Sequence, residues 1–240
     1  MATGLIIIAI NRATKFASLL LNSDKSYKAE VTLGIQTDTD DAEGAAICID
    51  EINSSKEQIK EILLSFSGES NQFAPAYSAL KHKGKPMYQY ARRGIKVKKE
   101  SRKIFIKKID NILINLPKVS FDIECSKGTY IRSIARDFGA KVGCGAHLSN
   151  LIRTSQQKFK LSEAYSIEDV SLENIIPLEE VFEELDSLRL NHDESMAFLN
   201  GKPLKLNIDH ENLLKVYDAS NKFIAIGKNT NKGFKHEYLV

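Results

Sequence analysis

The sequence predicts an α+β fold: a mixed, mostly antiparallel sheet flanked by helices, followed by a small β unit. Runs with alternating apolar residues, typical of half-buried strands, are interleaved irregularly with runs of helical spacing. The last part of the chain contains only short β-type runs separated by Asn, Lys and Gly. A chain of 240 residues with 42% hydrophobic composition is long enough for one large domain, 1–185, and a small one, 186–240.

The first part of the larger domain carries two predicted helices and a strand. A short helix is expected over Ala13–Leu21, and a strand over Tyr27–Ile35, where apolar residues alternate. Ser54 or Ser55 is expected to cap the second helix, because serine hydroxyls accept from the free N–H groups of a first turn. The apolar stripe of that helix consists of Ile59, Ile62, Leu63 and Phe66.

Two long strands and a helix are expected after a loop region over Asn71–Gly94. The strands cover Arg102–Leu116 and Val119–Cys125 and are joined by a turn at Pro117. Apolar residues at helical spacing then predict a helix that stops near Gly143. These residues are Ile131, Ile134, Ala135, Phe138 and Val142.

The end of the chain predicts an acidic helix and a compact β unit. The helix, around Pro177–Asp186, forms the edge of the larger domain. The β unit is built from short runs at Leu213–Asp218, Phe223–Gly227 and Glu237–Val240.

Charge is distributed unevenly along the chain, although the net charge is only +3. Between Lys81 and Lys108 there are twelve Lys or Arg residues and one acid, whereas Ser162–Asp186 holds nine acids and no Lys or Arg. A basic segment interleaved with Tyr88 and Tyr90 suits a polyanion with bases that can stack. The alternative is an ordinary solvated basic surface.

The cysteines and the apolar runs indicate a cytoplasmic protein without a membrane anchor. Cys48, Cys125 and Cys144 are odd in number and unclustered, which argues against a disulfide framework. The apolar run Leu5–Ile10 is too short to cross a bilayer. Cys144 and His147 lie two residues apart, but no further Cys or His has matching spacing, so no metal site is expected.

The most specific motif lies between the second long strand and the helix after it. Residues 126–133 read Ser-Lys-Gly-Thr-Tyr-Ile-Arg-Ser. The motif closely resembles one of the TruB family of pseudouridine synthases, which acts on the T-loop uridine at position 55 of tRNA. Further blocks resemble the family in the same order: 2–4, 13–16, 24–27, 36–40, 77–81, 88–92 and 143–148.

The resemblance implies a pseudouridine-synthase fold with a small C-terminal RNA-binding domain of the PUA type. It also implies an isomerase that needs no cofactor, because uridine is rearranged in place. Met1 stands where the family has a leucine after its nucleophilic aspartate, so that aspartate is expected to fall before residue 1. We therefore expect this chain to be truncated at its N-terminus, and no residue is assigned as the nucleophile.

Four residues receive roles from the resemblance. Arg132 pairs with the catalytic carboxylate. Tyr130 contacts the face of the flipped uracil or its sugar, and Tyr27 packs against the base and assists proton movement. The backbone of Leu151 contacts the uracil edge. From the residues alone, an alternative interpretation remains. Tyr130 and Leu151 can be core residues, and Arg132 can be an ordinary residue in the first turn of a helix. The loop acids Asp38, Asp40 and Asp41 match a block that does not hold the nucleophile, and Asp137 should face away from Arg132.

The T-arm of tRNA is the expected partner, with no membrane and no protein partner. RNA loops are recognised through backbone charge and stacking of splayed bases, and the basic segment offers both. The phosphate contacts expected there are Lys81, Arg92, Arg93, Lys96 and Lys98.

Two functions follow from these expectations. The first is a tRNA pseudouridine-55 synthase whose truncated chain is inactive, because its nucleophile is absent. The alternative is a catalytically silent protein that binds tRNA and helps it fold. An intact chain is expected to be a monomer, whereas the truncated chain should leave an apolar face or sheet edge uncovered and self-associate.

Overall fold

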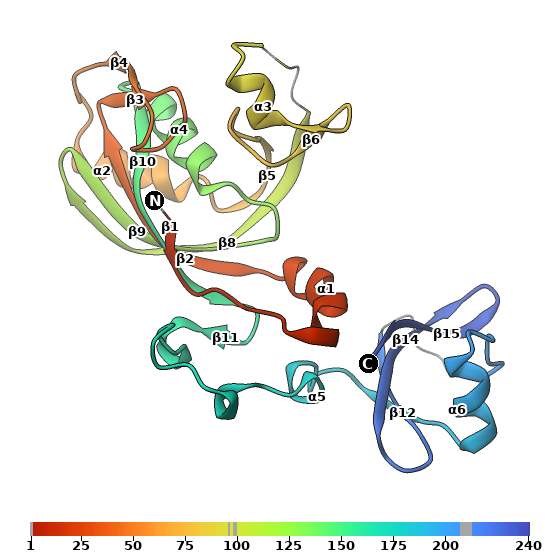
Figure 1. Ribbon diagram of the computed structural model, residues 1–240. Coiled ribbons are helices and arrows are strands. Elements are labelled where there is room, and N and C mark those ends of the chain that lie inside the picture. Colours follow the sequence, from red (N-terminus) through yellow and green to blue (C-terminus); the bar gives the residue numbers. More distant parts are fainter. Residues whose placement is uncertain (1, 96, 98–99, 207–212) are drawn as a thin grey trace. The chain divides into compact units, whose positions relative to one another are not determined.

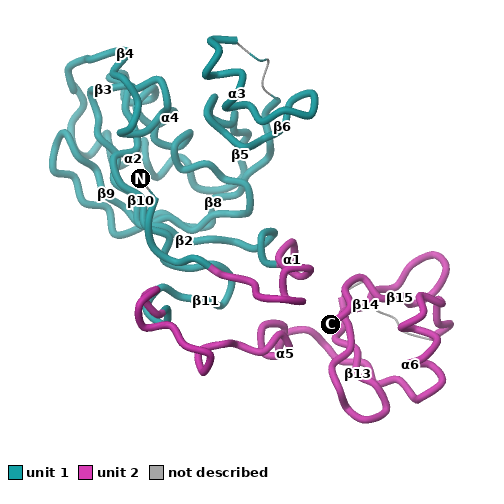
Figure 2. Tube along the Cα trace, in the orientation of Figure 1, with its two compact units in different colours: residues 1–6, 20–164 teal, residues 7–19, 165–240 magenta. Residues whose placement is uncertain are grey.

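The computed structural model describes residues 2–95, 97, 100–206 and 213–240 (Figure 1). By its internal contacts, the chain divides into two compact units, which are coloured separately in Figure 2. The first unit contains residues 1–6 and 20–164, and the second contains residues 7–19 and 165–240.

The first unit is built on a seven-stranded sheet in the described part of the chain, with strand order β1-β10-β2-β9-β8-β5 and β11 paired with β10. Only β1 and β10 pair in parallel, which confirms the predicted mixed, mostly antiparallel sheet. The strands are β1 (Ala2–Gly4), β2 (Lys25–Leu33), β5 (Gly68–Phe73), β8 (Ser101–Asn115), β9 (Lys118–Cys125), β10 (Ala146–Gln156) and β11 (Phe159–Lys160).

Two helices cover the sheet, α2 (Lys56–Leu64) and α4 (Ile131–Val142). α2 begins with a capping box, in which the Ser55 hydroxyl accepts from the backbone N–H of Gln58 and the Gln58 side chain accepts from that of Ser55. α4 ends at Gly143, whose φ of 92° is a left-handed conformation that glycine adopts readily.

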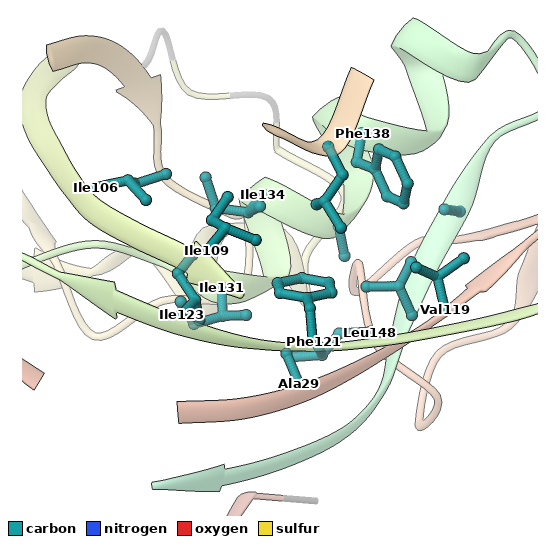
Figure 3. Packing of buried hydrophobic residues seen from close by; sticks show 14 of the residues in the cluster. Ala29, Ile106, Ile109, Val119, Phe121, Ile123, Ile131, Ile134, Phe138 and Leu148 are labelled. Carbon is teal, nitrogen blue, oxygen red and sulfur yellow. The ribbon is translucent and has the colours of Figure 1, made fainter. Parts of the chain in front are cut away.

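The core of the first unit lies between the sheet and these helices. The apolar stripes of both helices join alternate residues of β2, β8 and β9 in one buried cluster. Figure 3 shows the ring of Phe121 pointing from the sheet toward Ile134 and Phe138 of α4. Burial of these apolar side chains stabilises the packing of α4 on the sheet.

Short elements occupy the connections of the first unit. They are the hairpin β3 (Ile35–Thr37) and β4 (Ala46–Ile49), the hairpin β6 (Lys81–His82) and β7 (Lys85–Pro86), helix α3 (Met87–Ala91) and the 3-10 turn Leu161–Glu163. The region Asn71–Gly94, expected as loop, therefore contains the end of β5, one hairpin and α3.

The second unit holds a four-stranded sheet among its described residues, in the order β12-β13-β14-β15. Its strands are β12 (Ser187–Arg189), β13 (Leu214–Tyr217), β14 (Phe223–Thr230) and β15 (Gly233–Leu239). Its other elements are α5 (Leu178–Val181), α6 (His192–Leu199) and the 3-10 helices Asn11–Phe16 and Leu172–Asn174. Helix α1 (Ala17–Leu21) continues the first of these 3-10 helices across the boundary between the units.

The division between the units falls earlier than the boundary expected after residue 185. Phe182 packs in one buried cluster with Phe223 and Ile226 of β14, so the acidic segment before β12 belongs to the second unit. Phe16 joins the same cluster, with its ring centroid 5.8 Å from that of Phe182. The acidic helix is also shorter than expected, because α5 has only four residues.

Candidate active site at the start of α4

The junction between β9 and α4 is a tight turn. The Ser126 hydroxyl accepts from the backbone N–H of Phe105 at 2.9 Å, and the Thr129 hydroxyl donates to the Ser126 carbonyl at 2.9 Å. Gly128 has a φ of 77°, a left-handed conformation that other residues rarely adopt. The Ser-Lys-Gly-Thr part of the motif therefore builds the turn that delivers Tyr130 and Arg132 to the start of α4.

Tyr130 is held through its backbone by Gln72 of β5. The Gln72 side chain accepts from the Tyr130 N–H at 2.8 Å and donates to the Tyr130 carbonyl at 3.1 Å. Gln72 is only 2% exposed, so these two hydrogen bonds replace contacts with water for four polar groups. The guanidinium carbon of Arg102 lies 5.5 Å from the centroid of the half-buried Tyr130 ring.

Arg132 is held by three acceptors from two loops. Its Nη1 donates to the Thr39 carbonyl at 3.2 Å and to Oδ2 of Asp41 at 2.9 Å. Its Nη2 donates to the Tyr77 carbonyl at 2.7 Å. The Arg132 side chain is 24% exposed and that of Asp41 is 10% exposed. The guanidinium is thus fixed in position, and about a quarter of the side chain remains exposed.

Asp41 is fully engaged by its surroundings. Its Oδ1 accepts from the Thr39 hydroxyl at 2.7 Å and from the Glu43 backbone N–H at 3.1 Å, while Oδ2 accepts from Arg132. One turn along α4, Arg136 pairs with Asp40 at 3.2 Å. The acidic loop is therefore tied to α4 at two points.

The partners of Arg132 and Tyr130 are not evident from the sequence. From the sequence, Asp41 is a candidate only as a replacement nucleophile. An acid in a turn can equally form an ion pair with a basic helix. Asp137 pairs with its neighbour Arg136 at 2.8 Å rather than with Arg132, in line with its expected direction. Gln72 gives no signal, because a polar residue in a polar strand does not show which backbone it will meet.

Tyr27 and Leu151 lie on adjacent strands, β2 and β10. Tyr27 is opposite Arg153, and Leu151 is opposite Ala29 and next to Ala2 of β1. Burial raises the pKa of the Tyr27 hydroxyl above its ordinary value, and the nearby Arg153 guanidinium partly opposes this shift. Tyr27 therefore stays protonated at neutral pH. The Arg153 guanidinium is anchored by the Leu5 carbonyl, 2.6 Å from Nε.

The expected phosphate contacts lie around β6 and α3. Lys81 is exposed on β6, and Arg92 and Arg93 are exposed at the end of α3. The Arg92 guanidinium lies 5.4 Å from the Tyr88 ring centroid, an arrangement in which a cation stacks on an aromatic face. Lys96 and Lys98 lie outside the described residues.

Cys144 and His147, the two residues with spacing that could suggest a metal site, each contact a backbone carbonyl. The Cys144 thiol donates to the Gly145 carbonyl at 3.3 Å, and Nδ1 of His147 lies 2.8 Å from the Ile35 carbonyl. No group of three or more His, Cys, Asp or Glu side chains with metal-binding geometry occurs among the described residues. Within the same residues, none of the helices has the length and apolarity needed to cross a membrane.

Comparison with known proteins agrees with the motif. A family model described as "TruB family pseudouridylate synthase (N terminal domain)" matches residues 1–131. The tRNA pseudouridine synthase B of Clostridium kluyveri is 39% identical over 98% of this chain and 84% of its own length. That of Chromobacterium violaceum is 37% identical over 98% of this chain and 80% of its own length.

Solved structures support the expected fold. The crystal structure of a Cbf5-Nop10-Gar1 complex has a TM-score of 0.68 and 22% identity, and the match covers 100% of this chain and 72% of that chain. An H/ACA RNP bound to a substrate RNA containing 2′-deoxyuridine gives a TM-score of 0.65 at 19% identity, over 96% of this chain and 70% of that one. The expected pseudouridine-synthase fold is confirmed. The chain belongs to the TruB family of pseudouridylate synthases.

Proposed function

We propose that this chain binds the T-arm of tRNA and carries the uridine-binding residues of a site that converts uridine 55 to pseudouridine. The observation that carries the proposal is the fixed guanidinium of Arg132 at the start of α4, two residues after Tyr130. The relatives named tRNA pseudouridine synthase B support the substrate class.

The hydrogen bonds of Arg132 leave room for a second carboxylate. A guanidinium has five N–H groups, and the three bonds of Arg132 involve Nη1 twice and Nη2 once. Among the described residues, Nε–H has no acceptor, so the guanidinium keeps spare donor capacity. A second carboxylate bound there would be held ionised and oriented through charge-assisted hydrogen bonds.

Tyr130, Tyr27 and Leu151 are proposed to receive the target nucleotide. An enzyme that acts on a base in a folded RNA extrudes it and holds it by stacking and edge contacts. Tyr27 is proposed to pack against the base and assist proton movement, while the edge of uracil meets the backbone of Leu151. Lys81, Arg92 and Arg93 are proposed to contact phosphates, as are Lys96 and Lys98.

The chain is proposed to be catalytically silent by itself. Asp41 is the acid nearest to Arg132, but both of its oxygens are already bonded, so it is a poor substitute for a nucleophile. This engagement of Asp41 also favours the second candidate function, a silent tRNA-binding protein that assists folding.

One experiment with two readouts tests both candidates. The full chain is mixed with a T-arm stem-loop and with an anticodon stem-loop of equal length, and both affinity and pseudouridine content are measured. Preferential binding of the T-arm without pseudouridine is expected. Equal binding of the two stem-loops refutes the substrate proposal, whereas stoichiometric pseudouridine in a single turnover refutes the catalytic silence.

A further inference from the structure

We propose that Arg102 and Lys127 form a phosphate subsite that holds the RNA backbone next to the nucleotide seated at Tyr130. The proposal rests on the proposed function and names a part of the same site. It is carried by the stacking of Arg102, by the pairing of its neighbours and by an adjoining cavity.

Arg102 lies between the Tyr130 ring and the backbone at Gly128, which has no side chain. Its guanidinium carbon is 5.5 Å from the Tyr130 ring centroid, and its Nη1 lies 3.5 Å from the position that a Cβ on Gly128 would take. Stacking of this kind fixes the plane of a guanidinium while leaving its edge N–H donors free. Because the guanidinium lies over one face of Tyr130, a base that packs on this ring would use the other face.

The charge of Arg102 is uncompensated, in contrast to its neighbours on β8. Lys103 pairs with Glu69 at 3.0 Å, Lys107 with Asp24 at 2.7 Å, and Lys108 with Asp110. Among the described residues, no carboxylate lies within ion-pair distance of Arg102. Lys127 is similar, since its ammonium contacts only the neutral side-chain oxygen of Asn22, at 3.3 Å, in the described part of the chain.

Both cations line a single open cavity of about 490 Å³ in the first unit. Its wall also includes Leu21, Asn22, Ser101 and Gly128, and one acid, Glu100. Two cations against one acid leave the cavity positive. The Arg102 fork matches the planar arrangement of two phosphate oxygens, and the Lys127 ammonium adds a point charge. The anion expected in this cavity, beside Tyr130, is a backbone phosphate that flanks the target nucleotide.

The salt dependence of binding gives the first test. Binding of the full chain to a T-arm stem-loop is measured over a range of salt concentrations. Arg102→Gln and Lys127→Gln are each expected to reduce the slope of log K against log salt by about one. Each substitution removes one phosphate contact, so one counterion fewer is released when the RNA binds. Arg102→Lys should keep the slope. The matched control, Lys103→Gln, removes a paired cation from the adjacent position and should leave it unchanged.

A chemically altered RNA separates phosphate binding from a structural role. Stem-loops with a single neutral methylphosphonate linkage are compared at each position around the target uridine. At one position the wild-type chain should lose about tenfold in affinity, equivalent to about 1.4 kcal/mol, while Arg102→Gln shows no further loss. Merely structural support of Tyr130 would give both proteins the same profile, and that result overturns the proposal.

The remaining outcomes also discriminate. Lys127 lies on an exposed turn, so its variant tests the subsite even if Arg102→Gln fails to fold. If inorganic phosphate binds saturably while neither variant alters RNA binding, the site takes a free anion and the RNA assignment is overturned. If the wild-type chain does not prefer the T-arm at all, the proposed function fails, and this outcome is distinguishable from an unchanged slope in the variants.

Discussion

Arg132 and Asp41 form an ion pair of 2.9 Å that joins the first turn of α4 to the loop between β3 and β4. Because both side chains are largely buried, neither charge can be returned to water if its partner is removed. The pair therefore organises the site before any RNA binds, and it presents the remaining Arg132 donors in a fixed direction.

We predict that Asp41→Asn and Arg132→Gln each lower the free energy of unfolding of the first unit by about 3 kcal/mol, because each leaves a buried charge unpaired or poorly solvated. The double variant should lose less than the sum. The exposed pair between Lys103 and Glu69 is the control, since removing either member should cost less than about 1 kcal/mol. Denaturant unfolding measures both, and equal losses would contradict the argument.

Gln72 is predicted to support the site from β5. Gln72→Ala removes one acceptor and one donor from the Tyr130 backbone, which should cost about 2 kcal/mol and weaken T-arm binding. The exposed neighbour Asn71 provides the control, because Asn71→Ala should change neither quantity. Unaltered RNA affinity in a folded Gln72→Ala protein would show that the Tyr130 position does not depend on this bond pair.

Gly139 is predicted to be the least replaceable residue of α4. A Cβ on Gly139 would lie 2.2 Å from the backbone nitrogen of Ala146, at the start of β10, so helix and strand would have to separate. Gly139→Ala should therefore destabilise the first unit by about 3 kcal/mol. Gly143→Ala meets no atom within 4 Å and carries only the strain of its positive φ, about 1 kcal/mol. Thermal melts of the two variants distinguish the cost of steric overlap at Gly139 from the cost of backbone strain at Gly143.

Most of the main sheet could be predicted from alternation in the sequence. The strand expected over Val119–Cys125 is β9 (Lys118–Cys125), and the apolar stripe expected after Arg132 lies on α4, which ends beside the predicted Gly143. These segments are predictable because each has one buried face, and apolar residues recur along the sequence with the period of that face. The short hairpins and α3 are not predictable in this way, because elements of two to five residues have no periodicity to detect.

The site was predictable only in part, for a similar reason. A motif identifies Tyr130 and Arg132, but the residues that hold them lie 58 positions away for Gln72 and 91 positions away for Asp41. Such contacts depend on how β5 and the loop after β3 are brought to α4, which no local pattern encodes. The substrate-binding roles of Tyr27, Tyr130 and Leu151, and the pairing of Arg132 with the catalytic carboxylate, stay predictions.

The thiols provide a pH-dependent prediction. In the native chain only Cys48 is exposed, and burial raises the pKa of Cys125 to about 11. One thiol should therefore react with a thiol reagent at about pH 8, and all three after denaturation. The hydrogen bond to Asp50 raises the pKa of Cys48, so its labelling rate should still increase above about pH 9. Asp50→Asn should shift this profile to lower pH, and an unshifted profile would contradict the assigned cause.

Self-association is predicted through the exposed edge strand β1. Ile6, just after β1, is 69% exposed, and an exposed apolar side chain beside a sheet edge favours pairing between copies. Sedimentation should show a species that grows with concentration, and Ile6→Lys should reduce it. Leu172→Lys is the control, because Leu172 is 85% exposed but lies elsewhere in the chain. Equal effects of the two variants would rule out this edge.

The second tie between α4 and the acidic loop has a practical consequence for genetics. Since Arg136 grips Asp40 independently, the loop should remain docked when Arg132 is replaced. Losses of RNA modification in an Arg132 variant would then report mainly the missing positive charge. A substitution at Arg136 is the matching control, because Arg132 still pairs with Asp41 and keeps its charge.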